Sequence, residues 1–565
     1  MCQNILKLRQ KINGNYRELG IFLIGILCFL PSLQFDFVYD DIVHISQNLQ
    51  IRSLANTWEI FTTAIFPGNL FRPLVQFSHA LTYAFSGMNP FFFHLINLLL
   101  HASIAVLVYQ LFCLFFHDKL ALVAGILFAV LPIHTEAVVN ISGRAELFVT
   151  YFGLLVLLRL AGNKPEDFKA QLTTASLFCF ALLSKESAVV LLALALLLDY
   201  YRGLFRPGLY CLVFGLPLLV YFALRYFALG ALVETADIGM LENPLIQENL
   251  LGRISNGFYL LSWYLSLTLA PVKFSADYSY ATILPFRFGI DLPQTLVALS
   301  IAAIFAVTIY AAKLKYEIAF FSAWFFLSFT ITANILFPIG TIFAERLAYL
   351  PSIGIVGLLA YLITRVSSSR VQVICSTLLC ALYATVALAQ AQVWRDELTL
   401  RARQVEITPQ SAKALHHYGE FLRREKKLTA ARELMLRSLQ IYPRNPEALC
   451  SLAAIYFEEK NYQQALIELE KSKAIDHMHA RTYDLKARSY LMLGDKLEAL
   501  KNAKRAVELA PGDFPANLVL AGSYLALGDL NAGISIVKQL KMLNPEDPEL
   551  QSILEQLNAR GIMIK

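Results

Sequence analysis

Long apolar runs separated by short polar loops fill residues 1–393, and they constrain the fold more than any other feature of the chain. A helix needs about 20 apolar residues to cross the hydrocarbon core of a bilayer, with a lower limit of about 17. The whole chain is 57% hydrophobic and only 16% charged, which is far less polar than a soluble protein of this length. We therefore predict an all-α fold whose N-terminal part is a polytopic membrane helix bundle.

The apolar runs predict about eleven membrane-spanning helices. A further apolar segment at 250–271 is ambiguous. The predicted spans are 17–35, 91–116, 120–139, 146–162, 170–185, 187–202, 209–230, 294–313, 318–337, 346–365 and 371–392.

Lys and Arg in the short loops indicate the orientation, because cytoplasmic loops carry the excess of these residues. The N-terminal stretch KLRQKINGNYR precedes the first run and places the N-terminus in the cytoplasm. No small-residue cleavage site follows that run, which favours an uncleaved first helix. An odd number of crossings then places the C-terminal domain on the opposite, extracytoplasmic side. Five further basic loops fall at alternating boundaries on the cytoplasmic side: HDK (117–119), NKPEDFK (163–169), RGLFRP (202–207), KLKYE (313–317) and TRVSSSR (364–370).

These loops agree with eleven crossings only if 250–271 does not cross fully. We therefore interpret that segment as re-entrant or as lying along the membrane surface.

Internal repetition dominates the C-terminal domain, 394–565. Pro409, Pro443, Pro511 and Pro545 are spaced by 34 residues or twice 34, and His477 fills the missing position. Small residues recur at fixed places, where two antiparallel helices would approach closely. The period, the small residues and the terminal proline resemble tetratricopeptide repeats. The small pairs are Gly419/Ala431, Ala453/Ala465, Ala487/Ala499 and Ala521/Gly533.

We predict four repeats, a lead-in helix (WRDELTLRARQVEI) and a capping helix, which together form an α-solenoid. Such arrays form a concave superhelix that binds peptide segments or partner proteins. A rigid spacer without a ligand is the alternative. The repeats cover about 412–445, 446–479, 480–513 and 514–547, and the capping helix 548–560.

Two other features limit the function classes. The net charge is only +6 and no dense basic patch with interleaved aromatic residues occurs, so nucleic acid is not an expected partner. Six of the eight cysteines lie inside apolar runs, and no pair indicates a disulfide.

Asp40 and Asp41 lie in FDFVYDDIVH (35–44), immediately after the first apolar run. The flanking Phe35, Phe37, Val38 and Tyr39 would hold the carboxylates at the membrane interface, where a low dielectric raises a carboxyl pKa. A general base that activates a hydroxyl acceptor needs such a pKa. A merely solvated pair is the alternative.

Other polar residues in or near the spans are candidates for a substrate pocket. His94, Asn97 and His101 share one helical face, which fits interhelical hydrogen bonds and substrate contact equally well. His134 and Glu136 form an H-x-E pair, but such residues point apart on a helix and no third ligand is obvious, so we do not predict a metal site. Arg72 in FRPL and Glu345 complete the pocket candidates.

Arg144, Lys185 and Arg346 are the natural partners for a phosphate. The alternative is pairing with carboxylates two residues or fewer away in sequence, namely Glu146, Glu186 and Glu345. Adjacent helical residues point in different directions, which weakens that alternative.

Seven segments in order, followed by the repeats, resemble the transmembrane and tetratricopeptide-repeat-containing protein O-mannosyltransferases of the C-type glycosyltransferase superfamily. The resemblance covers almost the whole chain. The family's eukaryotic members carry longer repeat arrays, and Tyr39 stands where a Trp is common. The segments are FVYDD, FRPL, NPFFFHLINLLLH, PIHTEAVVNISGRAEL, LLSKES, FSADYS and FPIGTIFAERLAYLPSIG.

The resemblance implies a C-type glycosyltransferase fold of about eleven membrane helices, with the catalytic face toward the lumen or periplasm. It implies transfer of a sugar, typically mannose, from a polyprenyl-phosphate donor to a protein hydroxyl. An acidic residue of the first extracytoplasmic loop would be the base, which is Asp40 or Asp41 here, and we favour Asp40. The lipid-linked sugar is a co-substrate; no cofactor is expected, although a divalent metal is not excluded. The acceptor protein would bind the repeats.

Three other readings compete: a transferase that glycosylates a glycan or lipid, a non-catalytic membrane scaffold, and a transporter. The transporter is disfavoured because the polar residues lie at one face instead of the midplane. For the compartment, we expect a bacterial inner membrane with periplasmic repeats and an undecaprenyl carrier. The endoplasmic reticulum with a dolichyl carrier is the alternative. The only sequon, Asn140-Ile-Ser142, lies close to the membrane.

Overall fold

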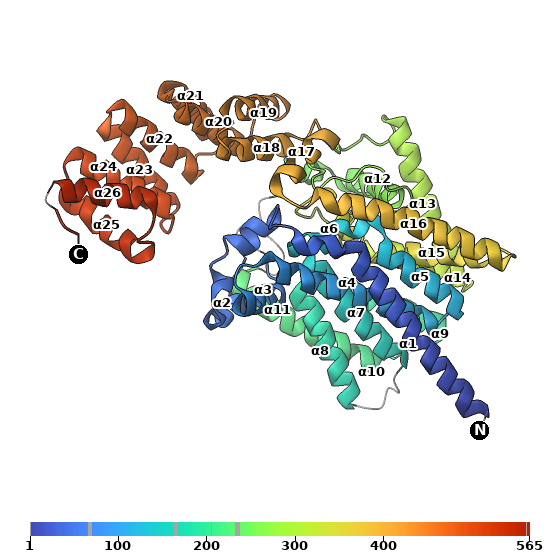
Figure 1. Ribbon diagram of the computed structural model, residues 1–565. Helices are drawn as coiled ribbons and strands as arrows, with labels where there is room; N and C mark the ends of the chain where they lie inside the picture. The colour runs from blue at the N-terminus through green and yellow to red at the C-terminus, as the bar shows by residue number, and fades with distance from the viewer. Residues whose placement is uncertain are drawn as a thin grey trace. The chain divides into compact units, whose positions relative to one another are not determined.

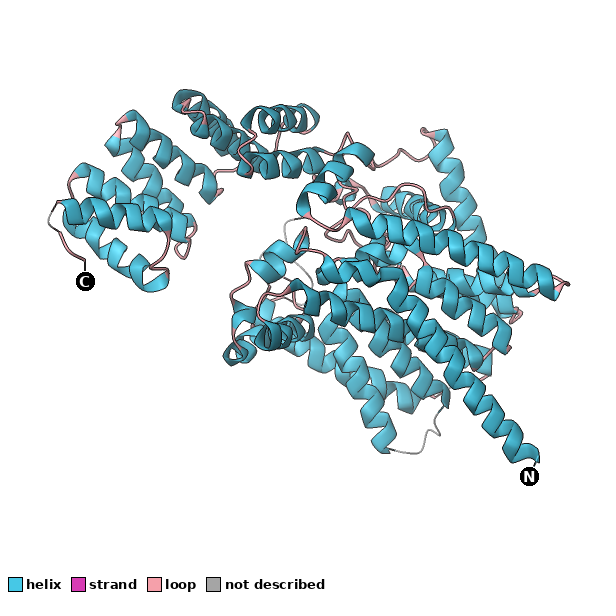
Figure 2. Ribbon diagram, viewed as in Figure 1, coloured by secondary structure: helices cyan, strands magenta, loops and turns pink. Residues whose placement is uncertain are grey.

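The computed structural model describes residues 2–65, 70–162, 168–204, 206–231, 238–560 and 562–564. In these ranges every regular element is helical, and no strand occurs beyond one isolated bridge between Ile65 and Leu70 (Figure 2). The chain divides into two compact units, Met1–Thr408 and Pro409–Lys565. The all-α prediction is confirmed.

The first unit is a bundle of mostly apolar helices (Figure 1). Its core is formed where α4 packs against α1, α5 and α7, and where α14 packs against α15. The helices are α1 (Cys2–Phe29), α2 (Thr57–Thr62), α3 (Pro73–Ser86), α4 (Pro90–Cys113), α5 (Asp118–Val130), α6 (Thr135–Val139), α7 (Arg144–Gly162), α8 (Phe168–Ser184), α9 (Val190–Arg202), α10 (Pro207–Tyr210), α11 (Leu216–Leu229), α12 (Leu250–Leu269), α13 (Leu292–Lys313), α14 (Glu317–Ser328), α15 (Ser352–Thr364), α16 (Ser369–Val393) and α17 (Glu397–Ile407).

Each of the eleven predicted spans overlaps one or more of these helices. Among the described residues, six helices are long and apolar enough to cross a membrane, or seven if Asp118–Val130 and Pro132–Val139 form one span bent by 49°. In α16 only 11% of the apolar window is buried inside the protein. Its exposed apolar side chains suit the hydrocarbon of a bilayer, and together with the other long apolar helices they indicate a membrane protein. The count of eleven stays a prediction.

The structure adds detail at two predicted segments. The ambiguous segment 250–271 is the continuous helix α12, which packs against α13. The span 318–337 is helical only to Ser328, after which the chain runs irregularly to the cavity described below. Asn334 stabilises this irregular stretch, because its side-chain amide donates to the Ile342 carbonyl at 3.1 Å. Of the loop 163–169, residues 163–167 lie outside the described residues.

In its described residues, 409–560 and 562–564, the second unit contains four antiparallel helix pairs and a last helix, as the repeat prediction requires. The small residues lie where the helices of a pair meet. A Cβ on Gly533 would lie 2.6 Å from Leu525 Cδ2, so no larger residue fits without rearrangement. The helices are α18 (Ala412–Arg424), α19 (Leu428–Ile441), α20 (Pro446–Glu458), α21 (Tyr462–Ile475), α22 (Ala480–Leu493), α23 (Lys496–Leu509), α24 (Phe514–Leu527), α25 (Leu530–Leu543) and α26 (Pro548–Ala559).

The lead-in helix α17 belongs to the first unit, because the division between the units falls after Thr408. The structural boundary therefore lies 15 residues beyond the 393/394 boundary drawn from the sequence, where the apolar runs end.

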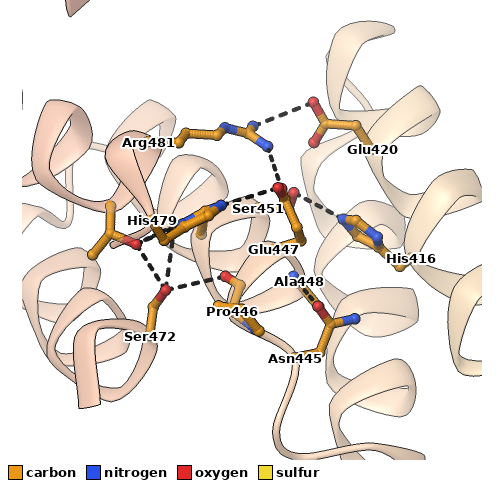
Figure 3. Close-up of polar contacts among 12 residues, drawn as sticks. His416, Glu420, Asn445, Pro446, Glu447, Ala448, Ser451, Ser472, His479 and Arg481 are labelled. Carbon is orange, nitrogen blue, oxygen red and sulfur yellow. Dashed lines mark hydrogen bonds and ion pairs between the residues drawn. The ribbon is translucent and has the colours of Figure 1, made fainter. Parts of the chain in front are cut away.

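A polar cluster connects successive repeats in the second unit (Figure 3). Glu447 on α20 accepts a hydrogen bond from His479 Nε2 at 3.0 Å and lies 3.5 Å from Arg481 Nη1. The hydrogen bond from His479 lowers the pKa of Glu447 to about 2. Burial alone would lower the pKa of His479, but hydrogen bonds with Cys450 and Glu447 raise it to about 10.

Replacing His479 with Gln is expected to destabilise the second unit in a pH-dependent way. The folded-state pKa of His479 is raised, so its contribution is complete below about pH 6.5 and is lost as the pH rises toward 10. The urea midpoint of wild type should therefore exceed that of His479→Gln at pH 5.5, and the two should converge by pH 10. Labelling of the buried Cys450 thiol measures the midpoint in the full chain. The exposed His477→Gln is the control, and an equal loss from both variants at all pH values would contradict this account.

Candidate active site

A cavity of about 690 Å³ in the first unit collects polar side chains from segments far apart in the sequence. It is lined by the loop after α1, one face of α3, the turn between α8 and α9, part of α11, and the irregular chain after α14. Among the described residues, four cationic side chains and two carboxylates contribute to this lining. The polar lining residues are Asp40, His44, Arg72, Gln76, His79, Asn140, Ser142, Lys185, Glu186, Ser187, Tyr221, Arg225, Thr332, Thr341 and Arg346.

Four of the eleven predicted site residues line this cavity: Asp40, Arg72, Lys185 and Arg346. The other seven, all described by the structure, are buried behind the wall or elsewhere in the bundle: Asp41, His94, His101, His134, Glu136, Arg144 and Glu345.

The adjacent carboxylates Asp40 and Asp41 have different environments. Asp40 is partly exposed in the cavity. Asp41 is fully buried and accepts hydrogen bonds from the backbone N–H of Ser142 at 2.7 Å, from its hydroxyl at 2.8 Å, and from the Ile141 N–H at 3.2 Å. Burial raises the pKa of Asp41 to about 7, although these donors lower it. Asp41 therefore anchors the loop to residues 141–142, and Asp40 is the carboxylate that a ligand can reach.

Arg346 enters the cavity from the loop before α15 and is fixed by Glu136 on α6. Its guanidinium forms an ion pair with the Glu136 carboxylate, and its backbone N–H donates to Glu136 Oε2 at 2.8 Å. The side chain of Glu136 is 1% exposed and that of Arg346 is 26% exposed, so Glu136 lies behind Arg346 and orients it.

Glu345 points away from the cavity. Its carboxylate accepts hydrogen bonds from the Ser275 N–H at 2.7 Å and the Tyr278 hydroxyl at 2.6 Å. It therefore fastens the SADYS loop to the segment that carries Arg346.

The other two predicted cations are paired across elements. Lys185 forms an ion pair with Glu146 of α7, and both side chains are less than a tenth exposed. Arg72 donates from Nη2 to Glu186 Oε1 at 2.9 Å. The pairing among sequence neighbours that we considered does not occur for Lys185 or Arg346, because the neighbouring carboxylates point elsewhere.

Arg144 is fully buried and does not reach the cavity. Its guanidinium donates to Asn97 Oδ1 at 2.9 Å, to the Phe93 carbonyl at 2.9 Å and to the Ser78 hydroxyl at 3.1 Å. This arrangement ties α7 to α3 and α4, so Arg144 is not retained among the phosphate-binding candidates.

Replacing Arg144 with Met is accordingly expected to lower the free energy of unfolding by about 2–4 kcal/mol, because buried acceptors lose their donors. Arg159→Met on the same helix is the matched control, since that side chain makes one hydrogen bond, to Thr174. Melting temperatures of the purified variants measure the difference. A normal melting temperature with selectively lost donor binding would contradict this structural role.

The histidines of the predicted pocket form contacts within the bundle. His101 Nδ1 lies 2.7 Å from the Tyr349 hydroxyl and its Nε2 lies 3.0 Å from the Ala129 carbonyl. His134 contacts the Phe128 carbonyl at 3.0 Å and the Ser352 hydroxyl at 2.8 Å. His94 is buried, with its ring edge-on to Phe35. These contacts favour the interpretation that these histidines connect helices of the bundle over the interpretation that they contact substrate.

Sequence reasoning missed several lining residues, notably His44, Gln76, His79, Tyr221 and Arg225. A usable signal was present in α3, where Arg72, Gln76 and His79 are spaced as one helical face. Among the described residues, no group of three His, Cys, Asp or Glu side chains is placed to hold a metal ion.

The chain is similar to known proteins over both parts. A family model described as tetratricopeptide repeat matches residues 422–489 and 490–557. The protein O-mannosyl-transferase F38B6.6 of Caenorhabditis elegans is 29% identical over 435 residues, which is 74% of this chain and 61% of that protein. Human protein O-mannosyl-transferase TMTC3 is 25% identical over 478 residues, 76% of this chain and 52% of that protein. These relatives confirm the resemblance predicted from the motifs.

The chain spans about half to three fifths of the length of these relatives. Among solved structures, a tetratricopeptide-repeat protein of Thermus thermophilus is 21% identical, covers 30% of this chain and 91% of that chain, and has a TM-score of 0.25.

Proposed function

Because its relatives are protein O-mannosyl-transferases, we propose that this chain is a membrane glycosyltransferase that moves a sugar, mannose, from a polyprenyl-phosphate donor to Ser or Thr hydroxyls of a protein. The observation that carries the proposal is the cavity itself. In it the carboxylate of Asp40 lies with the cations Arg72, Lys185 and Arg346, while the second lining carboxylate, Glu186, is paired with Arg72. A polyprenyl-phosphate sugar carries an anionic phosphate that these cations can stabilise, and the acceptor hydroxyl carries a proton that the Asp40 carboxylate can remove.

In the proposed reaction, Asp40 takes the proton of the acceptor hydroxyl as its oxygen attacks the anomeric carbon. The bond from that carbon to the phosphate oxygen breaks, and the electron pair leaves with the polyprenyl phosphate. A new glycosidic bond forms, and the carboxylic acid of Asp40 later releases its proton to water. A single displacement of this kind inverts the anomeric configuration.

Arg346 and Lys185 would bind the donor phosphate, with Arg72 beside them. Charge on the phosphate increases as the bond breaks, and cations fixed in advance stabilise that charge without rearranging. Glu136 and Glu146 hold Arg346 and Lys185 in place, which supplies this preorganisation.

The sugar would lie along α3. Gln76 and His79 follow Arg72 on the cavity face of that helix, and His79 lies about 10 Å beyond Arg72 at 1.5 Å rise per residue. The buried His79 Nδ1 has no hydrogen-bond partner among the described residues. Together with the Gln76 amide, these polar groups suit sugar hydroxyls.

The isoprenoid chain would follow the apolar part of the wall. Phe222, Ile331, Phe337, Ile339 and Leu347 line that part of the cavity. A donor whose tail stays in hydrocarbon needs such a wall next to its phosphate.

We further propose that residues 1–393 form the catalytic domain and that the repeats after it bind the acceptor protein. The N-terminus would lie in the cytoplasm and the repeats on the extracytoplasmic side, which is the periplasm in our preferred reading. The predicted number of eleven crossings and the basic loops in the sequence support this orientation.

The test follows labelled sugar from polyprenyl-phosphate mannose into the total protein and the lipid of membranes that contain the chain. Label on protein, removable by β-elimination from Ser and Thr, is expected. If the label enters only lipid or glycan, the acceptor is a lipid or glycan and the proposed protein acceptor is wrong. No transfer from any polyprenyl-phosphate sugar would overturn the proposal and leave a membrane scaffold.

A further inference from the structure

Tyr39, which immediately precedes the carboxylate pair, has an unusual backbone. Its φ is +57°, in the left-handed region that residues with a side chain rarely adopt. Non-glycine residues persist in this conformation only when their surroundings hold them there. The residues that hold Tyr39 therefore matter for Asp40.

Those residues come from α17 and the turn before it. The Tyr39 N–H donates to Glu397 Oε2 at 3.0 Å, and the other oxygen of that carboxylate accepts from Arg401 Nε at 2.7 Å. The Arg401 guanidinium lies 5.0 Å from the centre of the Tyr39 ring. Glu397 thus contacts the backbone of Tyr39 while Arg401 covers its ring.

Two further contacts fix the same stretch. The Trp394 ring lies edge-on to Tyr39 at 6.1 Å, and the Asp36 N–H donates to the Arg395 carbonyl at 3.1 Å. The stretch 36–39 is therefore fastened to 394–401 through backbone, ring and ion-pair contacts together.

The turn at Tyr39 is where the two carboxylates take different directions. Asp40 lines the cavity and Asp41 binds residues 141–142. If Tyr39 had an ordinary extended backbone and Asp41 kept its hydrogen bonds to residues 141–142, the side chain of Asp40 would point in a different direction.

We infer that Glu397 and Arg401 are positioning residues: they hold Tyr39 in the left-handed conformation that directs Asp40 into the cavity. The kinetic part of this inference rests on the proposed function. Because α17 ends at Ile407, directly before the repeat unit begins at Pro409, the chain segment that carries the repeats also fixes the candidate base.

The inference is tested in the full chain with Glu397→Leu and Glu397→Gln. Hydrogen exchange of peptides covering 36–44 should accelerate about tenfold or more in Glu397→Leu, and less in Glu397→Gln, which keeps an acceptor for the Tyr39 N–H. The kcat of sugar transfer should fall about 10- to 100-fold in Glu397→Leu while KM for the donor changes less than threefold. Glu406→Gln is the matched control on the same helix, because Glu406 is exposed and pairs with Arg403.

A double-mutant cycle with Tyr39→Gly separates positioning from general stability. Glycine adopts positive φ freely, so Glu397→Leu should cost less in the Tyr39→Gly background than in wild type. Additive effects, or unchanged exchange in 36–44, would overturn the inference. Faster exchange in a protein that transfers no sugar would uphold the positioning role and overturn only the proposed function.

Discussion

Replacing Asp40 with Asn is expected to lower kcat for sugar transfer by about 10²- to 10⁴-fold, the range that a positioned general base contributes. Asn has nearly the same shape but cannot take the acceptor proton. Since Asp40 is partly exposed in the cavity, the substitution should leave the melting temperature and the donor KM nearly unchanged. Single-turnover transfer from a saturating labelled donor measures the effect.

Asp41→Asn is the sharpest control, because it makes the same substitution at the next residue without touching the cavity. An Asn oxygen can still accept the hydrogen bonds from Ser142. We expect its effect on kcat to be at least about tenfold smaller than that of Asp40→Asn. The reverse order, with Asp41→Asn inactive and Asp40→Asn active, would move the role of base to Asp41.

Replacing Arg346 with Gln is expected to lower kcat by about 10²- to 10³-fold. In other enzymes, removing one preorganised hydrogen-bond donor to a developing negative charge lowers kcat by about this factor. Arg346→Lys should recover only part of this loss, because an ammonium group cannot make the bidentate contact of a guanidinium. Initial rates at saturating donor, together with donor KM, measure both variants.

Arg346→Gln also leaves the buried carboxylate of Glu136 without its ion-pair partner, which costs stability by itself. The double variant Arg346→Gln/Glu136→Gln removes that penalty and should regain the melting temperature without regaining activity. Arg206→Gln is the control for a lost ion pair outside the cavity, since Arg206 pairs with Asp199. Recovered activity in the double variant would show that Arg346 acts only on the fold.

The apolar runs predicted the helices of the first unit well, because length and hydrophobicity alone define a segment that must be helical in lipid. The exception was 318–337. There the helix ends at Ser328 although the sequence stays apolar. The following irregular stretch is stabilised by hydrogen bonds from the Asn334 side chain, which the sequence pattern does not predict. Likewise, the period of 34 residues predicted the repeats. The sequence did not predict that α17 packs in the first unit, because this depends on contacts between residues far apart in the chain, such as the hydrogen bond from Tyr39 to Glu397.

The candidate site was predicted in part. Charge in an apolar chain singled out Asp40, Arg72, Lys185 and Arg346, and these four line one cavity. The same criterion also marked Arg144 and Glu345, because a buried charge satisfied inside the fold looks identical in sequence to one that awaits a ligand. Only tertiary contacts separate Arg144, which is bound by Asn97 and Phe93, from Arg346, which is oriented by Glu136.

The central claim is that the donor phosphate and the sugar lie in the cavity beside Asp40. The most direct measurement is an electron cryomicroscopy structure of the Asp40→Asn protein with polyprenyl-phosphate mannose, since this variant should bind the donor without turning it over. We predict phosphate density within hydrogen-bond distance of Arg346 and Lys185, the sugar along α3, and the anomeric carbon facing residue 40. Well-defined donor density elsewhere in the chain, with this cavity free of it, would contradict the account.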